Sequence, residues 1–428
     1  MGESLLVRAG FWRDDTALTC EGVSLERVAS EVGTPAYVYS AGAIRGQYAA
    51  LDAVLTTIPH RVHYSVKANS NGAVLTLLRD LGAGVDIVSG GELYRALRAG
   101  FRGCDVVFSG VGKTEQELRE ALEAGVLLMN VESEAELRLL NDVATRLGRD
   151  ASVALRVNPE VTVDTPHPYT RTGERGMKFG IPADEALETA RLAMRLPHVR
   201  LAGVDMHIGS QVAQATPYVL GVQRLLALCD RVRSEGGDDL QYFDIGGGFA
   251  VPYQAEPPTD LAAFVKEVLP PIAATGFTLL VEPGRFLVAN AGVLLTRVLY
   301  RKRSGGRDFV IVDAGMNDLI RPSHYQAYHR IEAVRPVHTH RAVDIVGPVC
   351  ESGDSFAAGR ELDDVQVGDL VAIHSAGAYG ASMSSNYNSR VRAAEVLVDG
   401  ERFAVTAQRE CYEDLVRQEP AELDWRRG

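Results

Sequence analysis

Short apolar runs rich in β-branched residues alternate with longer amphipathic stretches over the first two thirds of the chain. This alternation is typical of strand–helix units built around a parallel sheet. Two of the stretches, Glu115–Ala124 and Glu134–Leu147, have the periodicity of amphipathic helices. The apolar runs are Val62–Val66, Val85–Val88, Val106–Phe108, Leu127–Val131, Val153–Val157, Val204–His207, Tyr242–Ile245 and Thr278–Val281. Eight consecutive units favour a closed (β/α)8 TIM barrel in the α/β class over an open sheet.

After Arg285 the pattern changes to apolar runs that no regular helical stretch separates. Turn signals occur at Ser304-Gly305-Gly306 and at Asp399-Gly400, and residues 1 to about 36 share this turn-rich character. Strands are predicted at Asp308–Val312, Asp344–Val346, Asp369–His374 and Ala394–Val398. We therefore expect a barrel domain over residues 37–285, and a second, all-β domain of the sandwich or barrel type formed by residues 1–36 and 286–428.

The composition is that of an ordinary globular enzyme with an acidic balance, with 46% hydrophobic residues and a net charge of −12. This balance argues against nucleic acid as the main partner and favours a small molecule. The five cysteines lack any Cys-x-x-Cys spacing, so neither a zinc site nor a disulfide framework is predicted. The N-terminus lacks the apolar segment of a signal peptide, and no apolar stretch of about 18 residues occurs. We expect a cytoplasmic protein without a membrane partner.

Polar residues and glycines follow the last apolar residue of most of the eight runs. In a barrel these positions share the C-terminal face, where catalytic groups collect. They are Lys67, Ser109-Gly110, Asn158, His207, Gly246-Gly247-Gly248 and Glu282. A partly desolvated amine at Lys67 can lose its proton near neutral pH and condense with a carbonyl, which is the chemistry that pyridoxal phosphate requires. Its own string, His63 to Asn69, is equally compatible with a surface lysine that follows a strand.

Six motifs occur in order along the chain: residues 85–93 (VDIVSGGEL), 207–211 (HIGSQ), 282–285 (EPGR), 313–323 (DAGMNDLIRPS), 350–354 (CESGD) and 377–380 (GAYG). With them the chain resembles the alanine racemase-like, fold-type III family of pyridoxal-phosphate enzymes, and within it the diaminopimelate decarboxylases. The resemblance runs from about residue 30 to residue 410. It implies a barrel plus a β-domain, in agreement with the hydrophobic pattern.

The resemblance implies pyridoxal 5′-phosphate as the cofactor and no metal. Lys67 would carry the cofactor as a Schiff base, and Glu282 would keep the pyridine nitrogen protonated, which makes the ring a strong electron sink. Alanine racemases have an arginine at the position of Glu282, so the glutamate favours decarboxylation. Asp86 and Glu92 resemble the acidic residues that hold the lysine and its neighbours in place. The cofactor-binding set would be Lys67, Asp86, His207, Ser210, Gly247, Gly248, Glu282, Pro283, Gly284, Arg285 and Tyr379.

The reaction that the resemblance implies is decarboxylation of meso-2,6-diaminopimelate at its D-centre to L-lysine and CO2, the last step of lysine biosynthesis by the diaminopimelate route. Lys67 and Cys350 would be the catalytic residues, with Cys350 as the proton donor. This amino-acid substrate needs a cation for its distal carboxylate and an acceptor for its distal ammonium. The substrate set would be Arg285, Arg321, Tyr325, Glu351 and Tyr379. A homodimer is implied, in which the Cys350 loop and the Tyr379 region complete the neighbouring subunit's active site.

Three other functions remain open. A related decarboxylase for a carrier-linked or polyamine-type amino acid would keep Lys67 and Cys350 but relax the distal site. A racemase would be expected to replace Glu282, and a non-catalytic cofactor-binding protein would be expected to lose the lysine or the cysteine loop. Residues 109–114 (SGVGKT) resemble a P-loop, but Val107 stands where that motif requires its first glycine, so nucleotide binding is not predicted.

Overall fold

The protein is described from a computed structural model that covers residues 9–13, 16–163, 167, 173, 176–254, 256–337 and 339–426. The chain divides into two compact units. The barrel unit spans Ala41–Ala291, and the β unit combines the chain up to Ser40 with the chain from Gly292 onward. The predicted boundaries at residues 37 and 285 fall within strand β4 (Ala36–Ser40) and at the start of helix α12 (Arg285–Val288). Of the predicted N-terminal segment, residues 1–8, 14 and 15 lie outside the described residues.

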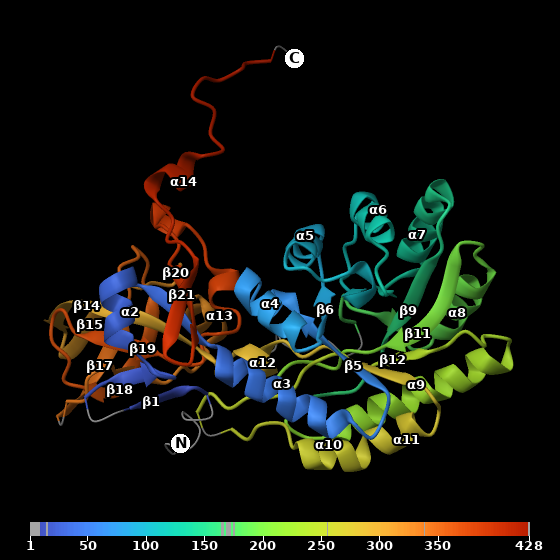
Figure 1. Cartoon of the computed structure of the whole chain (residues 1–428), viewed down its shortest axis with the longest axis horizontal. Helices are drawn as coiled ribbons and strands as arrows, with labels where there is room; N and C mark the ends of the chain where they lie inside the picture. The colour runs from blue at the N-terminus through green and yellow to red at the C-terminus, as the bar shows by residue number, and fades with distance from the viewer. Residues whose placement is uncertain are drawn as a thin grey trace. The chain divides into compact units, whose positions relative to one another are not determined.

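The barrel unit contains a closed ring of eight parallel strands (Figure 1). The strands are β5 (His60–Ser65), β6 (Gly84–Ile87), β7 (Val106–Phe108), β8 (Leu128–Val131), β9 (Ala151–Asn158), β11 (Val199–Asp205), β12 (Tyr242–Asp244) and β13 (Thr278–Val281). The ring closes through the β8–β9 and β13–β5 pairings, and a short strand β10 (Ile181–Pro182) extends it beside β9. Each of the eight apolar runs overlaps a strand of this ring, although the run Val204–His207 contains only the last two residues of β11, and the predicted barrel is confirmed.

Helices connect the strands of the barrel. They are α3 (Ala41–Leu55), α4 (Gly72–Asp80), α5 (Gly90–Arg98), α6 (Glu115–Ala124), α7 (Glu134–Leu147), α8 (Ala186–Arg195), α9 (Thr216–Ser234), α10 (Leu261–Glu267), α11 (Leu269–Ala273) and α12. Helices α6 and α7 have the predicted bounds because their ends are encoded locally. Thr114 and Glu117 form a capping box at the start of α6, and Gly125 ends it in the left-handed conformation.

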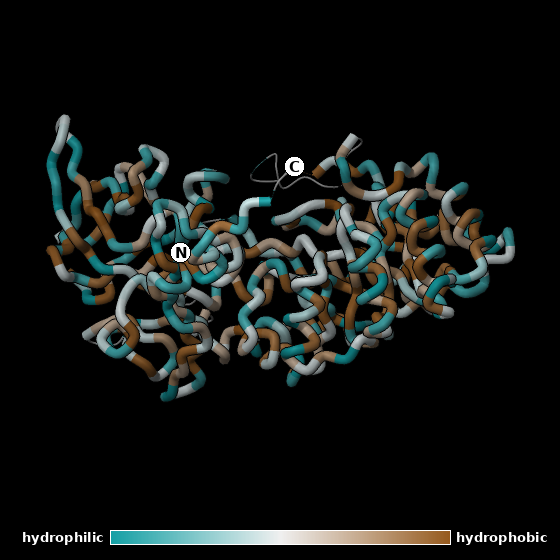
Figure 2. Tube along the Cα trace, turned by 90° about the horizontal axis from the view of Figure 1, so that it is seen from above, coloured by the Kyte–Doolittle hydropathy of each residue, from teal (hydrophilic) through white to brown (hydrophobic). Residues whose placement is uncertain are grey.

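Buried side chains from alternate positions of the strands fill the interior of the barrel. One such cluster consists of Val107, Leu128, Ala154, Ala202 and Leu280. At this level the interior is therefore a packed core. Hydrophobic and hydrophilic residues alternate along much of the trace in Figure 2, as expected of elements that bury one face.

The β unit is built on a nine-stranded sheet and a three-stranded antiparallel sheet. The small sheet contains β1 (Phe11–Arg13), β2 (Leu18–Cys20) and β3 (Val23–Ser24). The large sheet contains β4, β14 (Gly292–Ser304), β15 (Arg307–Val312), β16 (Ile331–Ala333), β17 (His340–Val346), β18 (Ser355–Asp363), β19 (Leu370–Ile373), β20 (Ala394–Asp399) and β21 (Arg402–Ala407). The four predicted strands are present, and the predicted β-domain is confirmed. Three short helices accompany the sheets: α2 (Leu25–Val32), α13 (Arg321–Tyr325) and α14 (Tyr412–Val416).

The long strand β14 organises the large sheet. Its first residues pair with β4, its middle with β19, and its last residues with β15 across the predicted glycine turn. Strand β4 also pairs in parallel with β20, so the two ends of the chain meet in one sheet.

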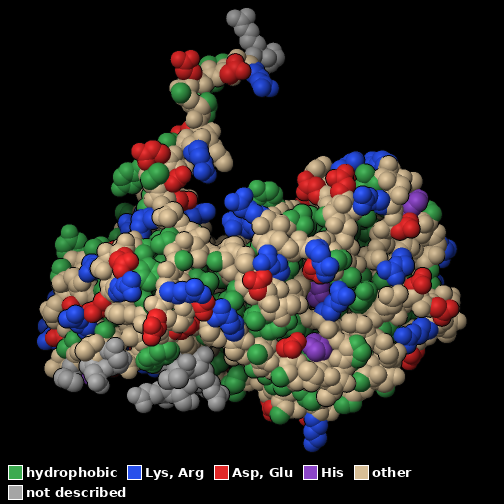
Figure 3. All heavy atoms as spheres, viewed as in Figure 1, with side chains coloured by type: hydrophobic (Ala, Val, Ile, Leu, Met, Phe, Trp, Pro, Cys, Tyr) green, Lys and Arg blue, Asp and Glu red, His purple; other side chains and the backbone are tan. Residues whose placement is uncertain are grey.

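The surface and the cysteines agree with the composition. Acidic and basic side chains of described residues are interspersed over the face seen in Figure 3, which lacks the basic stripe typical of nucleic-acid-binding proteins. All five cysteines are free thiols. No helix of the described chain has the length and apolar character needed to cross a membrane.

Candidate active site

Lys67 lies on a single 3-10 turn, Val66–Ala68, that directly follows β5. Its Nζ is 2.5 Å from Asp86 Oδ2 on β6 and 3.3 Å from Ser65 Oγ. The Asp86 side chain is fully buried, whereas that of Lys67 is 38% exposed. The structure therefore brings the two predicted residues together, with the amine open to solvent at the C-terminal end of the barrel strands and its counter-ion inside.

Glu92, on helix α5, shapes the loop that follows β6. Its Oε2 accepts a hydrogen bond of 2.8 Å from the Val88 N–H. Burial raises the pKa of Glu92 to about 7, against the smaller opposing effects of that hydrogen bond and of Lys67. Glu92 is thus a half-buried carboxyl close to the lysine, with a charge that changes near neutral pH.

The triple glycine follows β12 and brings the backbone close to its neighbours. Gly246 has a φ of +67°, and Gly248 has a φ of +94°. A Cβ atom on Gly247 would lie 2.2 Å from the Glu282 carbonyl oxygen, so no larger residue fits. The Gly247 N–H donates to His207 Nδ1 at 3.3 Å. Burial holds the pKa of His207 well below its usual range, and Arg156 acts in the same direction, so the imidazole is neutral.

Arg285 begins α12 and links two further groups. Its Nη1 donates to the Tyr253 hydroxyl at 2.7 Å, and its Nη2 donates to Ser210 Oγ at 3.3 Å. The predicted residues Ser210 and Arg285 are therefore neighbours. Tyr253 was missed, because nothing in its local sequence marks it as a functional residue.

The loop from Glu282 to Arg285 packs directly on the Lys67 turn. The Pro283 carbonyl accepts the Ser65 N–H at 3.1 Å. A Cβ atom on Gly284 would come within 3.0 Å of Ser65 Cβ and 3.1 Å of Ala68 Cβ, which is tighter than ordinary packing. Glycine at this position therefore allows the close approach of the two loops.

Glu282 is the buried carboxyl at the end of β13, with 7% exposure. Its Oε1 accepts hydrogen bonds from Asn130 Nδ2 at 3.2 Å and from Ser109 Oγ at 3.3 Å. Burial raises the pKa of Glu282 well above its usual range, and the nearby carboxyl groups, first Asp244, reinforce the effect. The sequence analysis missed Asn130, although a polar residue within an otherwise apolar strand was an available signal.

Lys113, from the run that resembles a P-loop, is an internal residue. Its Nζ lies 2.7 Å from Glu136 Oε1 and donates to the carbonyl oxygens of Asn130 and Gly110 at 2.7 and 2.9 Å. The side chain is 1% exposed. Lys113 thus forms a buried ion pair between α7 and the loop that follows β7, and it is not positioned as a phosphate ligand.

Within the β unit, Cys350 is exposed on the loop between β17 and β18. Its N–H donates to Asn388 Oδ1 at 2.9 Å. The Asp354 carboxylate fixes the loop by accepting the N–H groups of Met316 at 2.6 Å and Val349 at 2.7 Å. The CESGD motif is therefore a turn, held by its last residue, that leaves the cysteine on the surface of the unit.

Three predicted substrate residues lie around this turn. Glu351 is exposed, and its hydrogen bond to Tyr387 raises the pKa of that phenol. Helix α13 lies beside the turn, because Ser323 Oγ donates to the Gly353 carbonyl at 3.0 Å. This helix carries Arg321 and the half-buried Tyr325.

Arg321 is anchored from behind by a histidine that the sequence analysis missed. It is 7% exposed, and its Nη1 donates to His329 Nε2 at 2.9 Å. His329 Nδ1 in turn donates to the His374 carbonyl at 2.7 Å, which fixes the tautomer. The guanidinium is therefore held in one orientation.

Tyr379, the last predicted residue, is half-buried and has a φ of +57°. This left-handed conformation is uncommon for an aromatic residue, and it persists only where the surroundings impose it. A Cβ atom on the following Gly380 would lie 2.6 Å from the Ala376 carbonyl oxygen, so the backbone is tightly packed here.

Comparison with known proteins gives the family. Residues 41–289 match the family model of the pyridoxal-dependent decarboxylase, pyridoxal binding domain. The diaminopimelate decarboxylase of Pseudomonas aeruginosa is 50% identical over 402 residues, which cover 94% of this chain and 96% of that relative. The chain belongs to the diaminopimelate decarboxylase family.

Solved structures of diaminopimelate decarboxylases have the same fold. The enzyme from Helicobacter pylori, complexed with L-lysine, is 39% identical with a TM-score of 0.89 over 92% of this chain and 98% of that one. The M. jannaschii enzyme in co-complex with L-lysine is 34% identical with a TM-score of 0.91 over 96% of this chain and 98% of that one. The predicted family and fold class are therefore confirmed, and the chain is a decarboxylase of a pyridoxal-dependent family.

Proposed function

We propose that the protein decarboxylates meso-2,6-diaminopimelate at its D-centre to L-lysine and CO2, with pyridoxal 5′-phosphate as the cofactor. The observation that carries the proposal is the Lys67–Asp86 pair at 2.5 Å, on a turn that packs against the loop after Glu282. The similarity to diaminopimelate decarboxylases over 94% of the chain supports the substrate. Structures of two relatives hold L-lysine, the product of this reaction.

The residues of the barrel unit fit this cofactor. They provide an amine for covalent attachment, a glycine turn in which added side chains would clash, and a buried carboxyl for the ring nitrogen. We assign attachment to Lys67 and the ring contacts to Asp86, His207 and Glu282. We assign the phosphate to Ser210, Gly247, Gly248, Pro283, Gly284 and Arg285, and a further cofactor contact to Tyr379 of the neighbouring subunit. When bound, pyridoxal phosphate supplies an aldehyde that condenses with amines and a ring that accepts the electron pair left by CO2.

The catalytic side chains hold and move protons around the reacting carbon. Asp86 orients the Lys67 amine and stabilises its protonated form by charge. Cys350 donates a proton from Sγ to the α-carbon that has lost CO2, and its exposure on the loop gives it access to substrate.

Substrate selection depends on the distal amino-acid end. His329 holds the Arg321 guanidinium in one orientation, and a planar guanidinium suits bidentate binding of a carboxylate, so we assign Arg321 to the distal carboxylate. Tyr325 and Glu351 lie on the same side of the β unit, on α13 and on the adjoining turn, and we assign them to the distal carboxylate and the distal ammonium. Arg285 and Tyr379 contact both cofactor and substrate in this assignment.

We also propose a homodimer in which the Cys350 loop and the Tyr379 region complete the neighbouring subunit's active site. Cys350, Glu351 and Tyr387 are exposed on the surface of the β unit, which supports a role in contacts with another chain. Free thiols at all five cysteines support a reducing compartment, the cytoplasm.

The test is to measure CO2 and L-lysine release from meso-diaminopimelate with added pyridoxal phosphate. L,L-diaminopimelate, L-lysine and L-ornithine are assayed in parallel. We expect lysine from the meso compound alone. Turnover of another amine without turnover of the meso compound would instead identify a related decarboxylase with the same chemistry and a different distal site.

A further inference from the structure

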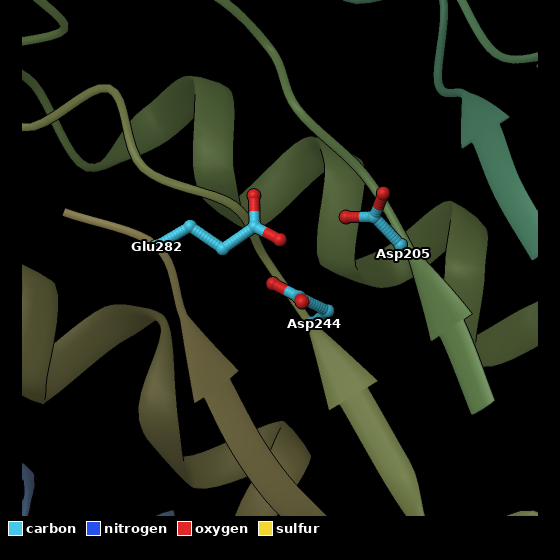
Figure 4. A group of neighbouring side chains, drawn as sticks. All are labelled: Asp205, Asp244 and Glu282. Carbon is cyan, nitrogen blue, oxygen red and sulfur yellow. The ribbon is translucent and has the colours of Figure 1, made fainter. Parts of the chain in front are cut away.

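Three carboxyl groups meet inside the barrel at the ends of three adjacent strands (Figure 4). Asp205 ends β11, Asp244 ends β12, and Glu282 follows β13. Each offers an oxygen atom within 4.8 Å of the other two. The residues are 1%, 0% and 7% exposed, respectively. We refer to Asp205, Asp244 and Glu282 as the carboxyl triad.

The described residues supply the triad with little positive charge. Arg156 Nε lies 3.9 Å from Asp205 Oδ2, but the same guanidinium binds Glu132 Oε1 at 3.0 Å. Lys67 is already paired with Asp86. Three negative charges at this spacing, away from water, repel one another too strongly to be held by part of one arginine. The triad therefore retains at least one proton at neutral pH.

Two buried oxygen atoms without hydrogen-bond partners also indicate that the carboxyl triad retains a proton. Asp205 Oδ1 and Asp244 Oδ2 are buried and have no hydrogen-bond partner among the described residues. Each of these two carboxyl groups also has an oxygen atom within 4.8 Å of a Glu282 oxygen atom. A proton on one of the three carboxyl groups would supply the donor that these oxygen atoms lack and would remove one of three neighbouring negative charges.

We propose that the carboxyl triad shares a proton, and that Glu282 presents this proton to the pyridine nitrogen of the cofactor. On transfer, the O–H bond of Glu282 breaks, an N–H bond forms on the ring, and Glu282 keeps the electron pair as a carboxylate beside the new cation. Asp205 and Asp244 are positioning residues that act through Glu282. This inference rests on the proposed function, which assigns Glu282 to that nitrogen.

The two aspartates differ in how they are held. Asp244 Oδ1 accepts the Gly246 N–H at 2.8 Å, which fixes its carboxyl toward Glu282. Asp205 Oδ2 lies 3.9 Å from Arg156 Nε, but burial, followed by the charge of Asp244, raises the pKa of Asp205 well above its usual range. The charged and titratable groups around the triad, one element after another, are Lys67 after β5, Asp86 on β6, Glu132 after β8, Arg156 on β9 and His207 after β11. Because most are acids or already paired, they favour retention of the proton.

The first test is infrared spectroscopy of the cofactor-free protein between pH 6 and 9, in which a protonated buried carboxyl gives a carbonyl band distinct from that of carboxylates. We expect this band at pH 7.5, and its loss on adding Asp244→Asn, which replaces a negative charge near Glu282 with a neutral amide donor; both proteins carry Glu92→Gln, because the Glu92 carboxyl, with a pKa of about 7, would give a band of its own. The matched control is Asp318→Asn in the β unit, because Asp318 is also buried and burial raises its pKa to about 6, so this substitution should leave the band at pH 7.5 unchanged. Absence of the band from the protein with Glu92→Gln alone overturns the proposal, whether or not the double variant folds.

The second test follows the dissociation constant for pyridoxal phosphate over the same pH range. In the wild type, the affinity for pyridoxal phosphate should decrease as the pH rises, and the midpoint of this decrease should equal the midpoint at which the infrared band disappears. In Asp244→Asn this midpoint should move down by about one pH unit, the effect of removing one nearby like charge. An unchanged midpoint overturns the proposal. A divalent ion that the wild type retains and Asp244→Asn loses, measured by elemental analysis, also overturns it, because the triad would then be a metal site.

The two hypotheses fail in different ways. If meso-diaminopimelate is not decarboxylated but the infrared band and the cofactor affinity still titrate together, the proposed substrate is wrong and the shared proton stands. If decarboxylation occurs and the band is absent, the proposed function stands and the shared proton is wrong.

Discussion

The strand ends of the barrel and the Cys350 loop of the β unit position functional residues in two different ways. In the barrel, Lys67 and Glu282 follow strands directly, and each contacts buried polar groups on neighbouring strands. In the β unit, Cys350 lies on an exposed turn whose shape depends on Asp354 and on backbone groups near residue 316. The comparison teaches that a closed sheet fixes its site through the register of its strands, even between residues as far apart in the sequence as Asn130 and Glu282, whereas the loop site is fixed by hydrogen bonds made by the loop and its neighbouring segments.

The largest expected effect comes from removing the amine at the strand end. Lys67→Ala should abolish the visible absorbance band of the bound cofactor and lower kcat on the order of 10⁴-fold, because the covalent attachment is lost. Absorbance spectra and lysine release measure the two effects. Lys266→Ala, an exposed lysine on α10, is the control and should leave both unchanged. A persistent band in Lys67→Ala would show that the cofactor is not attached to Lys67.

The next effect concerns the loop. Cys350→Ala should lower kcat by roughly 10²–10⁴-fold, the usual contribution of a general acid, while the cofactor absorbance is retained. Cys411→Ala is a matched control, since this thiol is also exposed in the β unit. Full activity of Cys350→Ala would show that the proton donor lies elsewhere. The Cys350 loop would then not contribute a catalytic residue.

A smaller effect is expected at the anchored arginine. Arg321→Ala should lower kcat/KM for meso-diaminopimelate about 100-fold, mainly through KM, because the distal carboxylate loses a charged hydrogen-bonding partner. Steady-state kinetics beside Arg402→Ala, an exposed arginine on β21, measure the difference. If the substitution lowers kcat instead and leaves KM unchanged, Arg321 does not bind the ground-state substrate.

The smallest effect is a pH-dependent change in stability in the barrel. Because burial raises the pKa of Glu92 from 4.5 to about 7, the folded state binds its proton more tightly than the unfolded chain. The contribution of Glu92 to the free energy of unfolding is therefore fully present below about pH 4.5 and declines as the pH rises to about 7. Glu92→Gln should be more stable than the wild type by roughly 1 kcal/mol at pH 8, after a discount for partial exposure, and equally stable at pH 4.5. Urea denaturation of the cofactor-free proteins at both pH values measures this difference. A gain of the same size at both pH values would exclude titration of Glu92 as its cause.

The features of the barrel that could be predicted from the sequence depend on local signals and on the order of the strands. Helix α6 was predicted to the residue because Thr114, Glu117 and Gly125 encode its ends locally. The family resemblance associated Asp86 with Lys67, and the two residues lie at the ends of the adjacent parallel strands β5 and β6. Their contact needs no information beyond the strand order.

Other parts of the site carry no local signal. His329 lies eight residues beyond Arg321 and anchors it only because the chain turns back after α13. Tyr253 reaches Arg285 from a loop 32 residues earlier. Such contacts depend on how the loops fold over one another, and the loop conformations cannot be predicted from the hydrophobic pattern of the sequence.

The position of strand β4 has a consequence for the order in which the chain is made. Its apolar residues 36–40 leave the ribosome early, but their partners in β14 and β20 begin at residues 292 and 394. During synthesis the barrel strands can therefore close while β4 still lacks its sheet. An unpaired apolar strand is a site for non-native association, so the interval between its synthesis and that of β20 is the period in which the nascent chain most needs protection.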